Sequence, residues 1–275
     1  MSTDESNAPS TVKDVAEAVS AVAKAVPIYD DAVQPAAKEL GKGLTTIMKT
    51  VNVALAPLEV VIWGYDQIKE YVSATVTDKL EDIPEEDIIT PKSSVAGPAL
   101  EALRFVGNEE SLREMYTNLL ANSMDKKTEK LAHPAFVEII KNMNSDEAKI
   151  MKYFTTRFRV PIIDVESSKS GENGQQAHMQ KQSLIGYESG CDFPELVPNY
   201  LDNLNRLGLI NIRFDIHLTA ESIYEPIINH SVTEELKVKI QSEERIFVPK
   251  KGLVERTDLG FQFCKTCVID KHTQV

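Results

Sequence analysis

The chain has 275 residues, enough for one large or two modest domains with a sizeable core. Its 42 acidic and 30 basic side chains give a net charge of −12, which excludes a global positive field for nucleic acid or anionic lipid. With 42% hydrophobic and 26% charged residues, the composition is globular rather than disordered or dominated by membrane spans. Three cysteines without framework spacing favour a reducing compartment, and Met1 to Ser10 lacks a secretory pattern, so we expect a cytoplasmic protein.

Helical periodicity dominates the N-terminal third of the chain. Small apolar residues recur at three- and four-residue steps over residues 12–26, and larger ones do so over residues 40–72. Small residues bury little area each, so such a helix needs a partner helix to persist. The pattern predicts an N-terminal helical hairpin or bundle over residues 1–82.

Residues 44–63 are apolar on more than one helical face. This is typical of a helix that touches a membrane or of one buried against another helix. We favour the buried or oligomer-facing helix, because Lys49 and Glu59 place charges inside the run and Pro57 breaks it. A membrane contact through this segment stays open as an alternative.

Helical segments with clear start and stop signals predict a central helical domain over residues 83–158. A short helix is expected over residues 95–106, and Asn108 is a candidate N-cap of the next helix. The proline of His133-Pro134 is suited to the first turn of a third helix. Ser145 is the candidate N-cap of a fourth, with two acidic residues in its first turn.

The C-terminal region, residues 159–275, departs from a purely helical pattern. Runs that alternate with period two predict half-buried strands, and a polar stretch, residues 167–182, predicts an inserted loop. The expected order begins with a strand at 159–165, a helix at 194–207 and a strand at 209–216. An inserted helix within 221–244 follows. Two strands, at 245–248 and 253–256, end the region and are joined by a wing tip at Lys250-Lys251. The expected fold class is therefore mainly α, with an N-terminal helical hairpin or bundle, a central helical domain and a C-terminal α+β winged-helix-like part.

A winged helix suggests DNA binding, so the charge of the predicted recognition helix matters. That helix, within residues 193–207, carries Glu195 and Asp202 against Arg206 alone. Phosphate contacts supply much of the affinity in protein–DNA complexes, and this helix would repel phosphates. We therefore expect protein docking rather than nucleic-acid binding, with a winged-helix nucleic-acid-binding regulator kept as an alternative.

The middle of the chain also carries a set of runs in a characteristic order. They are Ala99–Leu103, Tyr116–Asp125, His133–Ile140 and Ser145–Ile150, followed more weakly by residues 204–210 and 259–267. This order resembles the abortive infection alpha (Abi-alpha) family, best over residues 85–155. The resemblance implies a bacterial role in phage resistance, in which the infected cell is sacrificed or arrested, and it implies no known reaction. The family-motif residues are Asn118, Leu119, Leu120, Asn122, His133, Pro134 and Phe136.

The polar members of this motif have structural and chemical interpretations. Asn118 and Asn122 lie four residues apart on one helical face, which suits hydrogen bonds to a neighbouring helix better than a ligand site. His133 precedes a proline at a helix start, without a second histidine, cysteine or paired carboxylate nearby at catalytic spacing. We interpret it as a turn and capping residue rather than as a general base.

The cysteines and one histidine form a candidate zinc site. Cys264 and Cys267 have CxxC spacing, His272 follows five residues later, and Cys191 lies far upstream. The same spacing places two small hydrophobic residues one helical turn apart, which is the interpretation we favour. The common nucleotide-binding and hydrolase motifs do not occur in the sequence, so we expect neither a cofactor nor an enzyme.

The composition predicts a cytoplasmic protein, and the resemblance to the abortive infection alpha family implies an antiphage defence role, which we expect to act through protein interaction or assembly. The partner would be a phage or host protein, or a second copy of the chain. A membrane-active effector that uses the N-terminal helices is the alternative from a different class.

Overall fold

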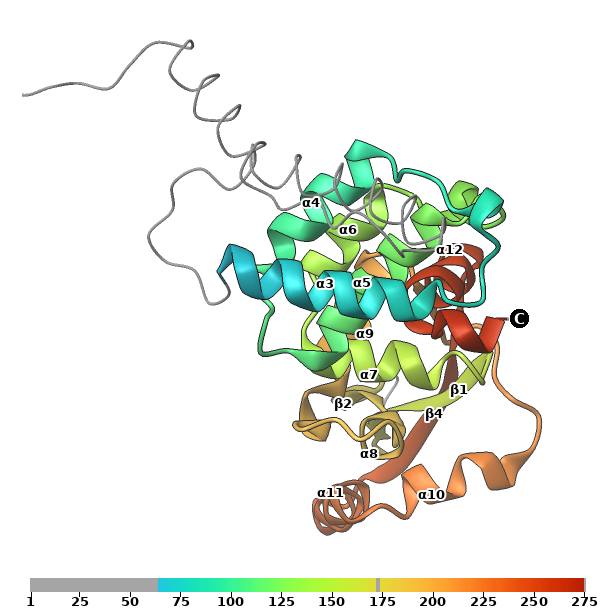
Figure 1. Ribbon diagram of the computed structural model, residues 1–275. Helices are drawn as coiled ribbons and strands as arrows, with labels where there is room; N and C mark the ends of the chain where they lie inside the picture. Colours follow the sequence, from blue (N-terminus) through green and yellow to red (C-terminus); the bar gives the residue numbers. More distant parts are fainter. Residues whose placement is uncertain (1–63, 172–173, 275) are drawn as a thin grey trace, which may run out of the picture.

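The computed structural model describes residues 64–171 and 174–274 (Figure 1). The first half of this part is helical. Its helices are α3 (Tyr65–Lys79), α4 (Ser93–Leu103), α5 (Glu110–Met124), α6 (Ala135–Lys141) and α7 (Ser145–Tyr153), with short 3-10 turns η1 (Glu85–Asp87) and η2 (Glu129–Leu131). The N-terminal helices expected over residues 12–63 lie outside the described residues.

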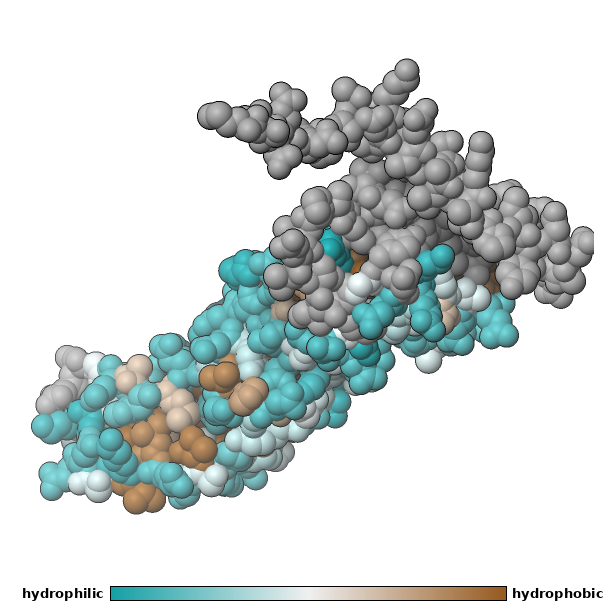
Figure 2. Space-filling model, turned by 60° about the vertical axis from the view of Figure 1, so that its left-hand side comes forward, coloured by the Kyte–Doolittle hydropathy of each residue, from teal (hydrophilic) through white to brown (hydrophobic). Residues whose placement is uncertain are grey.

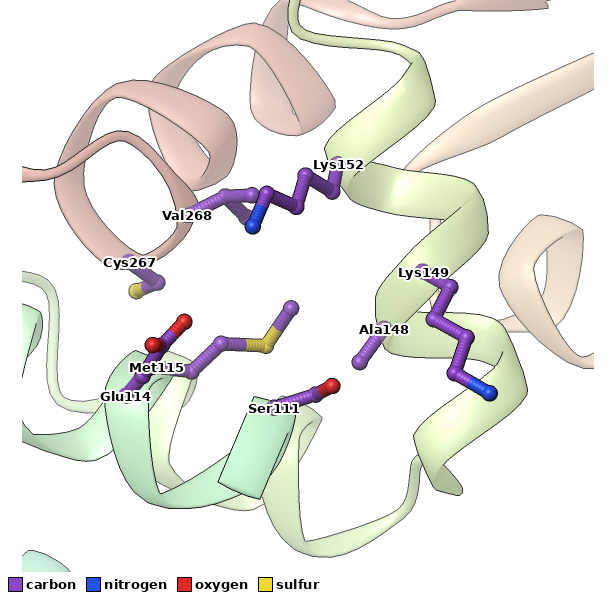
Figure 3. Close-up of a pocket in the computed structure, with 8 residues that line it drawn as sticks. All are labelled: Ser111, Glu114, Met115, Ala148, Lys149, Lys152, Cys267 and Val268. Atoms are coloured by element: carbon purple, nitrogen blue, oxygen red, sulfur yellow. The ribbon is translucent and has the colours of Figure 1, made fainter. Parts of the chain in front are cut away.

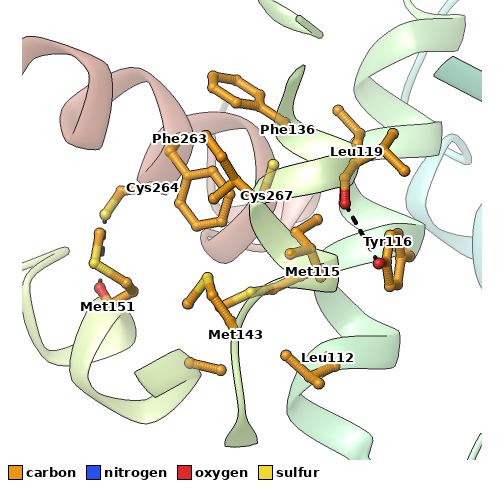
Figure 4. Close-up of a cluster of buried hydrophobic side chains, with 14 of the residues drawn as sticks. Leu112, Met115, Tyr116, Leu119, Phe136, Met143, Met151, Phe263, Cys264 and Cys267 are labelled. Carbon is orange, nitrogen blue, oxygen red and sulfur yellow. Dashed lines mark hydrogen bonds between the residues drawn. The ribbon is translucent and has the colours of Figure 1, made fainter. Parts of the chain in front are cut away.

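Helix α5 is the centre of the molecule. Every residue from Met115 to Met124 is buried, so this part of the helix is enclosed on all sides rather than amphipathic. Helices α3, α4, α6 and α7 pack around it, and a C-terminal segment closes the remaining side (Figure 1). The core around it is rich in aromatic rings and sulfur atoms, including the edge-to-face pair of Phe136 and Phe263 with ring centres 5.4 Å apart (Figure 4).

The starts of the helices lie close to the predicted caps, with shifts of one residue. Helix α7 is capped by Asn144, whose side chain accepts from the Glu147 N–H while the Glu147 carboxylate accepts from the Asn144 N–H, each at 2.9 Å. The expected cap, Ser145, is instead the first residue of the helix. Helix α5 likewise begins one residue later than Asn108 predicts, and α6 begins directly after Pro134 as expected.

A four-stranded antiparallel sheet follows the helices, in the order β2-β1-β4-β3. Its strands are β1 (Arg159–Ser168), β2 (Gln176–Gln182), β3 (Ile210–Arg213) and β4 (Ile246–Arg256). Between them lie α8 (Ile185–Glu188), η3 (Pro194–Leu196), α9 (Val197–Arg206), η4 (Glu221–Ile223), α10 (Glu225–Ile228) and α11 (Ser231–Ser242). The chain then continues through α12 (Asp258–Phe263), the π-helical turn η5 (Cys264–Val268) and η6 (Lys271–Gln274).

The predicted fold class is wrong, and strand β4 shows why. The wing tip expected at Lys250-Lys251 lies inside one continuous strand, in register with Asp164 and Ile163 of β1, so no two-stranded wing forms there. Gly252 is present for packing and not for a turn. A Cβ atom at that position would lie 2.5 Å from the Phe214 ring and 2.6 Å from the Arg213 carbonyl oxygen.

Two further predictions for the C-terminal region, a loop at residues 167–182 and a single helix within 221–244, also differ from the structure. The polar stretch 167–182, expected as a loop, ends in strand β2, which pairs with β1 at the edge of the sheet. Edge strands need only one pairing neighbour, so a sequence without an apolar alternation can occupy that position. The inserted helix expected within 221–244 is divided into α10 and α11, with a short break at Asn229-His230.

One hydrophobic cluster spans most of the described chain. It includes Ile68 of α3, Leu119 of α5, Ile162 of β1 and Phe263 of α12. A second, smaller cluster lies between the sheet and helices α10 and α11. The proposed division into residues 1–82, 83–158 and 159–275 stays a prediction, and side chains from both sides of the boundaries at 82 and 158 share the larger cluster.

Candidate functional site

The motif asparagines lie at the contact between α5 and the C-terminal segment. The Asn118 side-chain amide donates to the Cys267 carbonyl oxygen at 3.1 Å, and that of Asn122 donates to the Thr266 carbonyl oxygen at 3.0 Å. A π-helical turn leaves carbonyl groups without their usual helical partners, and buried carbonyls need a donor. The two asparagines supply it across about 150 residues of sequence.

A buried ion pair extends this contact by one helical turn. The Lys271 ammonium lies 2.5 Å from Oδ2 of Asp125 and also donates to Asn122 Oδ1 at 3.0 Å and Thr128 Oγ1 at 2.8 Å. All three ammonium protons therefore have acceptors. Burial raises the pKa of Asp125, but the hydrogen bonds from Lys271 and from the Lys127 N–H outweigh it and hold that pKa below its ordinary value. We call Asn118, Asn122, Asp125, Thr128 and Lys271, with the carbonyls of residues 266 and 267, the clasp.

Helix α3 joins the same C-terminal segment from another side. Lys79 forms an ion pair with Asp270. His272 lies between two carboxylates of α3 and its C-terminal extension, with Nε2 3.3 Å from Asp78 and Nδ1 3.4 Å from Asp82. The hydrogen bond to Asp78, with a smaller one to Asp82, raises the pKa of His272 above its ordinary value. The C-terminal segment thus ties the first described helix to the central one.

A second buried carboxylate ties α7 to the segment before α9. Asp146 accepts from the backbone N–H groups of Asp192 and Phe193 at 2.8 and 2.9 Å, and from the Tyr200 hydroxyl at 3.0 Å. Burial works to raise the pKa of Asp146, but these hydrogen bonds and one from Lys149 outweigh it and lower that pKa. The carboxylate has its acceptor positions filled by the fold, which suits a structural role.

The remaining motif residues also serve packing and turns. Leu119 and Leu120 are fully buried, and Phe136 packs against Phe263. The His133 ring is exposed, and its Nδ1 accepts from the Ala135 N–H at 3.1 Å at the start of α6. This is the turn and capping geometry that the sequence suggested for it.

The structure does not bring the four candidate zinc ligands together. The Cys191 sulfur contacts the Asp146 carbonyl oxygen, the Cys264 sulfur contacts the Met151 carbonyl oxygen, and His272 faces the carboxylates of α3. Burial raises the pKa of Cys264 to about 11 and raises that of Cys267 well above the ordinary thiol value. In residues 64–171 and 174–274, no group of three or more His, Cys, Asp or Glu side chains is placed to hold a metal ion.

Two hollows adjoin helix α5, and the smaller one reaches the clasp at Cys267. The smaller, of about 30 Å³, is lined by Ser111 and Met115 of α5, by α7, and by Cys267 (Figure 3). Its volume is small beside that of ligand pockets, which measure several hundred Å³. Lys149 on its wall turns outward and pairs with Asp146 and Asp192. The larger, of about 340 Å³, lies between α4, α5 and α6.

Sequence reasoning found the two asparagines and missed their partners. Asp125 is the last residue of the run Tyr116–Asp125, and no sequence pattern indicated a role for Lys271. The signal that pointed to the site was the presence of two amides, four residues apart, beside the apolar Leu119 and Leu120. Which acceptors they reach depends on contacts between distant parts of the chain, which local patterns do not encode.

The described residues also bear on the membrane alternative. Among them, no helix combines the length and the apolar character that crossing a bilayer requires. Residues 44–63, on which that alternative depends, lie outside the described residues.

Comparisons with known proteins identify a matching family. A family model described as "Abortive infection alpha" matches residues 64–267. No curated protein matches the chain. A solved structure, described as that of an uncharacterized protein from the hydrocarbon-degrading marine bacterium Alcanivorax borkumensis SK2, is 15% identical and covers 52% of this chain and 96% of its own, with a TM-score of 0.34.

Proposed function

Because the chain belongs to the abortive infection alpha family, we propose that it is an antiphage defence protein that acts through protein interaction or assembly rather than catalysis. The observation that carries the non-catalytic part is how the motif side chains are used. Asn118 and Asn122 donate to backbone carbonyls, and Phe136 packs in the core. Motif side chains that are engaged in internal hydrogen bonds and core packing stabilise the fold, and few of their polar groups remain to contact a substrate.

Exposed apolar side chains support the interaction part of the proposal. Large hydrophobic residues are exposed at the end of the molecule that holds α10 and α11, where Figure 2 shows a hydrophobic area with hydrophilic surroundings. Val238 and Ile246 are 59% and 57% exposed. Apolar patches with polar rims are a feature of protein interaction sites. The proposed partner is a phage or host protein.

A plating assay with a panel of phages tests the defence role. Cells that express the full chain are expected to reduce plaque counts relative to the empty vector. At high multiplicity the culture is expected to collapse or stop growing, while at low multiplicity it survives. Unchanged plaque counts over the whole panel would contradict the defence role.

The non-catalytic mechanism needs its own variants. His133 is an exposed titratable side chain of the motif and caps the start of α6, so His133→Ala is expected to retain protection. Ile47→Asp places a charge in the apolar stripe of residues 40–51 and is expected to abolish protection, with Thr45→Asp on a polar position as its matched control. Loss of protection in His133→Ala at unchanged stability would indicate catalysis and reject the mechanism.

A further inference from the structure

The larger hollow, between α4, α5 and α6, has an apolar floor. Leu112 and Tyr116 of α5 and Val137 and Ile140 of α6 form it, and all four are buried. The exposed ring of Phe105, 52% exposed, lies on its wall. A volume of about 340 Å³ is within the range of small ligand pockets and suits a few aliphatic side chains. We call this hollow the α4–α6 cavity.

The rim of the α4–α6 cavity is acidic. Glu101, Glu109 and Glu138 line it, against Lys141 as the basic residue among the lining side chains. Ser145 donates to the Glu109 carboxylate at 2.8 Å, which fixes one of these charges in place. An apolar floor with a negative rim is complementary to a segment that carries apolar residues with lysines beside them.

Residues 38–51 of the same chain have that composition. Their apolar residues Leu40, Leu44, Ile47, Met48 and Val51 recur at helical spacing, and the segment has Lys38, Lys42 and Lys49 against Glu39, a net charge of +2. The other N-terminal stripe, residues 12–26, contains small residues, with two lysines balanced by Asp14 and Glu17. Charge and side-chain size therefore both favour residues 38–51 as the occupant.

The middle of α3 lies close to residues that neighbour the cavity. The Tyr71 ring of α3 lies 5.2 Å from the guanidinium carbon of Arg113, and Arg113 donates to the Gly107 carbonyl oxygen. Gly107 lies between Val106 and Glu109, which both line the cavity. Twelve residues separate residue 51 from Gly64 and can span up to about 40 Å when extended, ample for this connection.

We propose that the α4–α6 cavity is the docking site of residues 38–51 of the same chain. Docking places the apolar stripe against Leu112, Tyr116 and Val137 and the lysines against the glutamates of the rim. Its purpose rests on the proposed function: when residues 38–51 leave the cavity, their apolar side chains become free for assembly. The docked and undocked chains are then the two states of a switch.

Photocrosslinking of the full chain tests the docking directly. Phe105→p-benzoylphenylalanine places a photoreactive group on the cavity wall, and Val238→p-benzoylphenylalanine is the matched control on the exposed face of α11. After irradiation of the purified protein, mass spectrometry is expected to find crosslinks from position 105 to residues 38–51, and none from position 238. Mixed heavy- and light-isotope chains identify the origin of each link. Absence of links to residues 38–51, or links solely between two copies, would overturn the proposal.

Charge reversal gives a second readout that a general loss of structure would not produce. Lys49→Glu and Glu138→Lys are each expected to lower the yield of this crosslink several-fold, and the double variant is expected to restore it. Lys13→Glu, in the other stripe, is the control and is expected to leave the yield unchanged. If the double variant stays as low as the single ones, Lys49 does not face Glu138 and the proposed docked position is wrong.

The two proposals fail separately. The crosslink is measured on purified protein without phage, so its absence from the Phe105→p-benzoylphenylalanine protein rejects the docking while the plating assay still tests defence. An intact crosslink together with no protection against any phage rejects the defence role and leaves the docking in place.

Discussion

Lys271 and Asp125 form an ion pair inside the protein, with side chains that are 5% and 3% exposed. They are 146 residues apart in the sequence and join the C-terminal segment to the end of α5. Removing one partner of a buried pair leaves an uncompensated charge, and this costs more than the loss of an exposed pair. The clasp should therefore be the most sensitive polar contact of the described chain.

We expect Lys271→Met to lower the free energy of unfolding by about 3–5 kcal/mol, because Asp125 would remain charged and buried. Urea unfolding followed by circular dichroism measures this. Lys126→Met, at an exposed position of the same connector, is the control and should stay within about 0.5 kcal/mol of wild type. Equal losses in the two variants would show that the pair contributes little.

The two motif asparagines should differ in their effect. Asn122 donates to Thr266 and accepts from Lys271, whereas Asn118 donates to Cys267 through its amide. Each alanine substitution leaves a buried carbonyl without its donor, at a cost of about 1–3 kcal/mol. We expect Asn122→Ala to be the more destabilising variant in urea unfolding. Asn205→Ala, at an exposed position of α9, is the control, and the reverse order would contradict the hydrogen-bond assignment.

The stabilising effect of His272 should depend on pH. Its pKa is raised in the folded state by Asp78 and Asp82, above an unfolded value of about 6.5. The protonated form is therefore favoured by folding, so its contribution is complete below about pH 6.5 and is lost as the pH rises through the folded pKa. Comparison of wild type with His272→Gln should show a difference in unfolding midpoint that shrinks on going from about pH 6 to about pH 9.

Salt provides the control for this prediction. His272 is partly exposed, so high salt should reduce the difference seen at low pH. A difference that is independent of pH would mean that the histidine contributes by packing alone.

The three thiols should react at very different rates. Burial raises the pKa of all three thiols, but Cys264 and Cys267 are buried whereas Cys191 is half-buried and open to reagents. The thiolate is the reactive form, so we expect a thiol reagent to label Cys191 in the native protein and all three cysteines after unfolding. Cys191→Ser should abolish the native labelling. Rapid native labelling of two or more thiols would show that the C-terminal segment opens readily.

Local patterns predicted the helices well where the signal was strong. Helices α6 and α7 begin within one residue of the predicted starts, because Pro134 and the Asn144–Glu147 capping box are local features. Strand β4 was predicted as two strands, because Lys250-Lys251-Gly252 reads as a turn when its neighbours are unknown. In the structure β1 pairs along its whole length, and that pairing overrides the local signal.

The candidate site could be predicted in part. Two amides on one face of a helix, beside buried leucines, indicated a hydrogen-bonded contact with a neighbour, and the structure has one. The spacing of Cys264 and Cys267 gave no way to tell buried packing from metal binding. That distinction requires the three-dimensional structure, in which Cys191 and His272 lie in other parts of the fold.

The long separation between Asn118 and its acceptor at Cys267 has a consequence for synthesis of the protein. Asn118 emerges from the ribosome 149 residues before the segment that covers it. At translation rates of ~5–20 residues per second, that side of α5 stays uncovered for roughly 7–30 seconds. Chaperones that hold nascent apolar surfaces have that interval in which to act, and a premature stop codon before residue 264 yields a product that keeps this surface open and is a target for proteolysis.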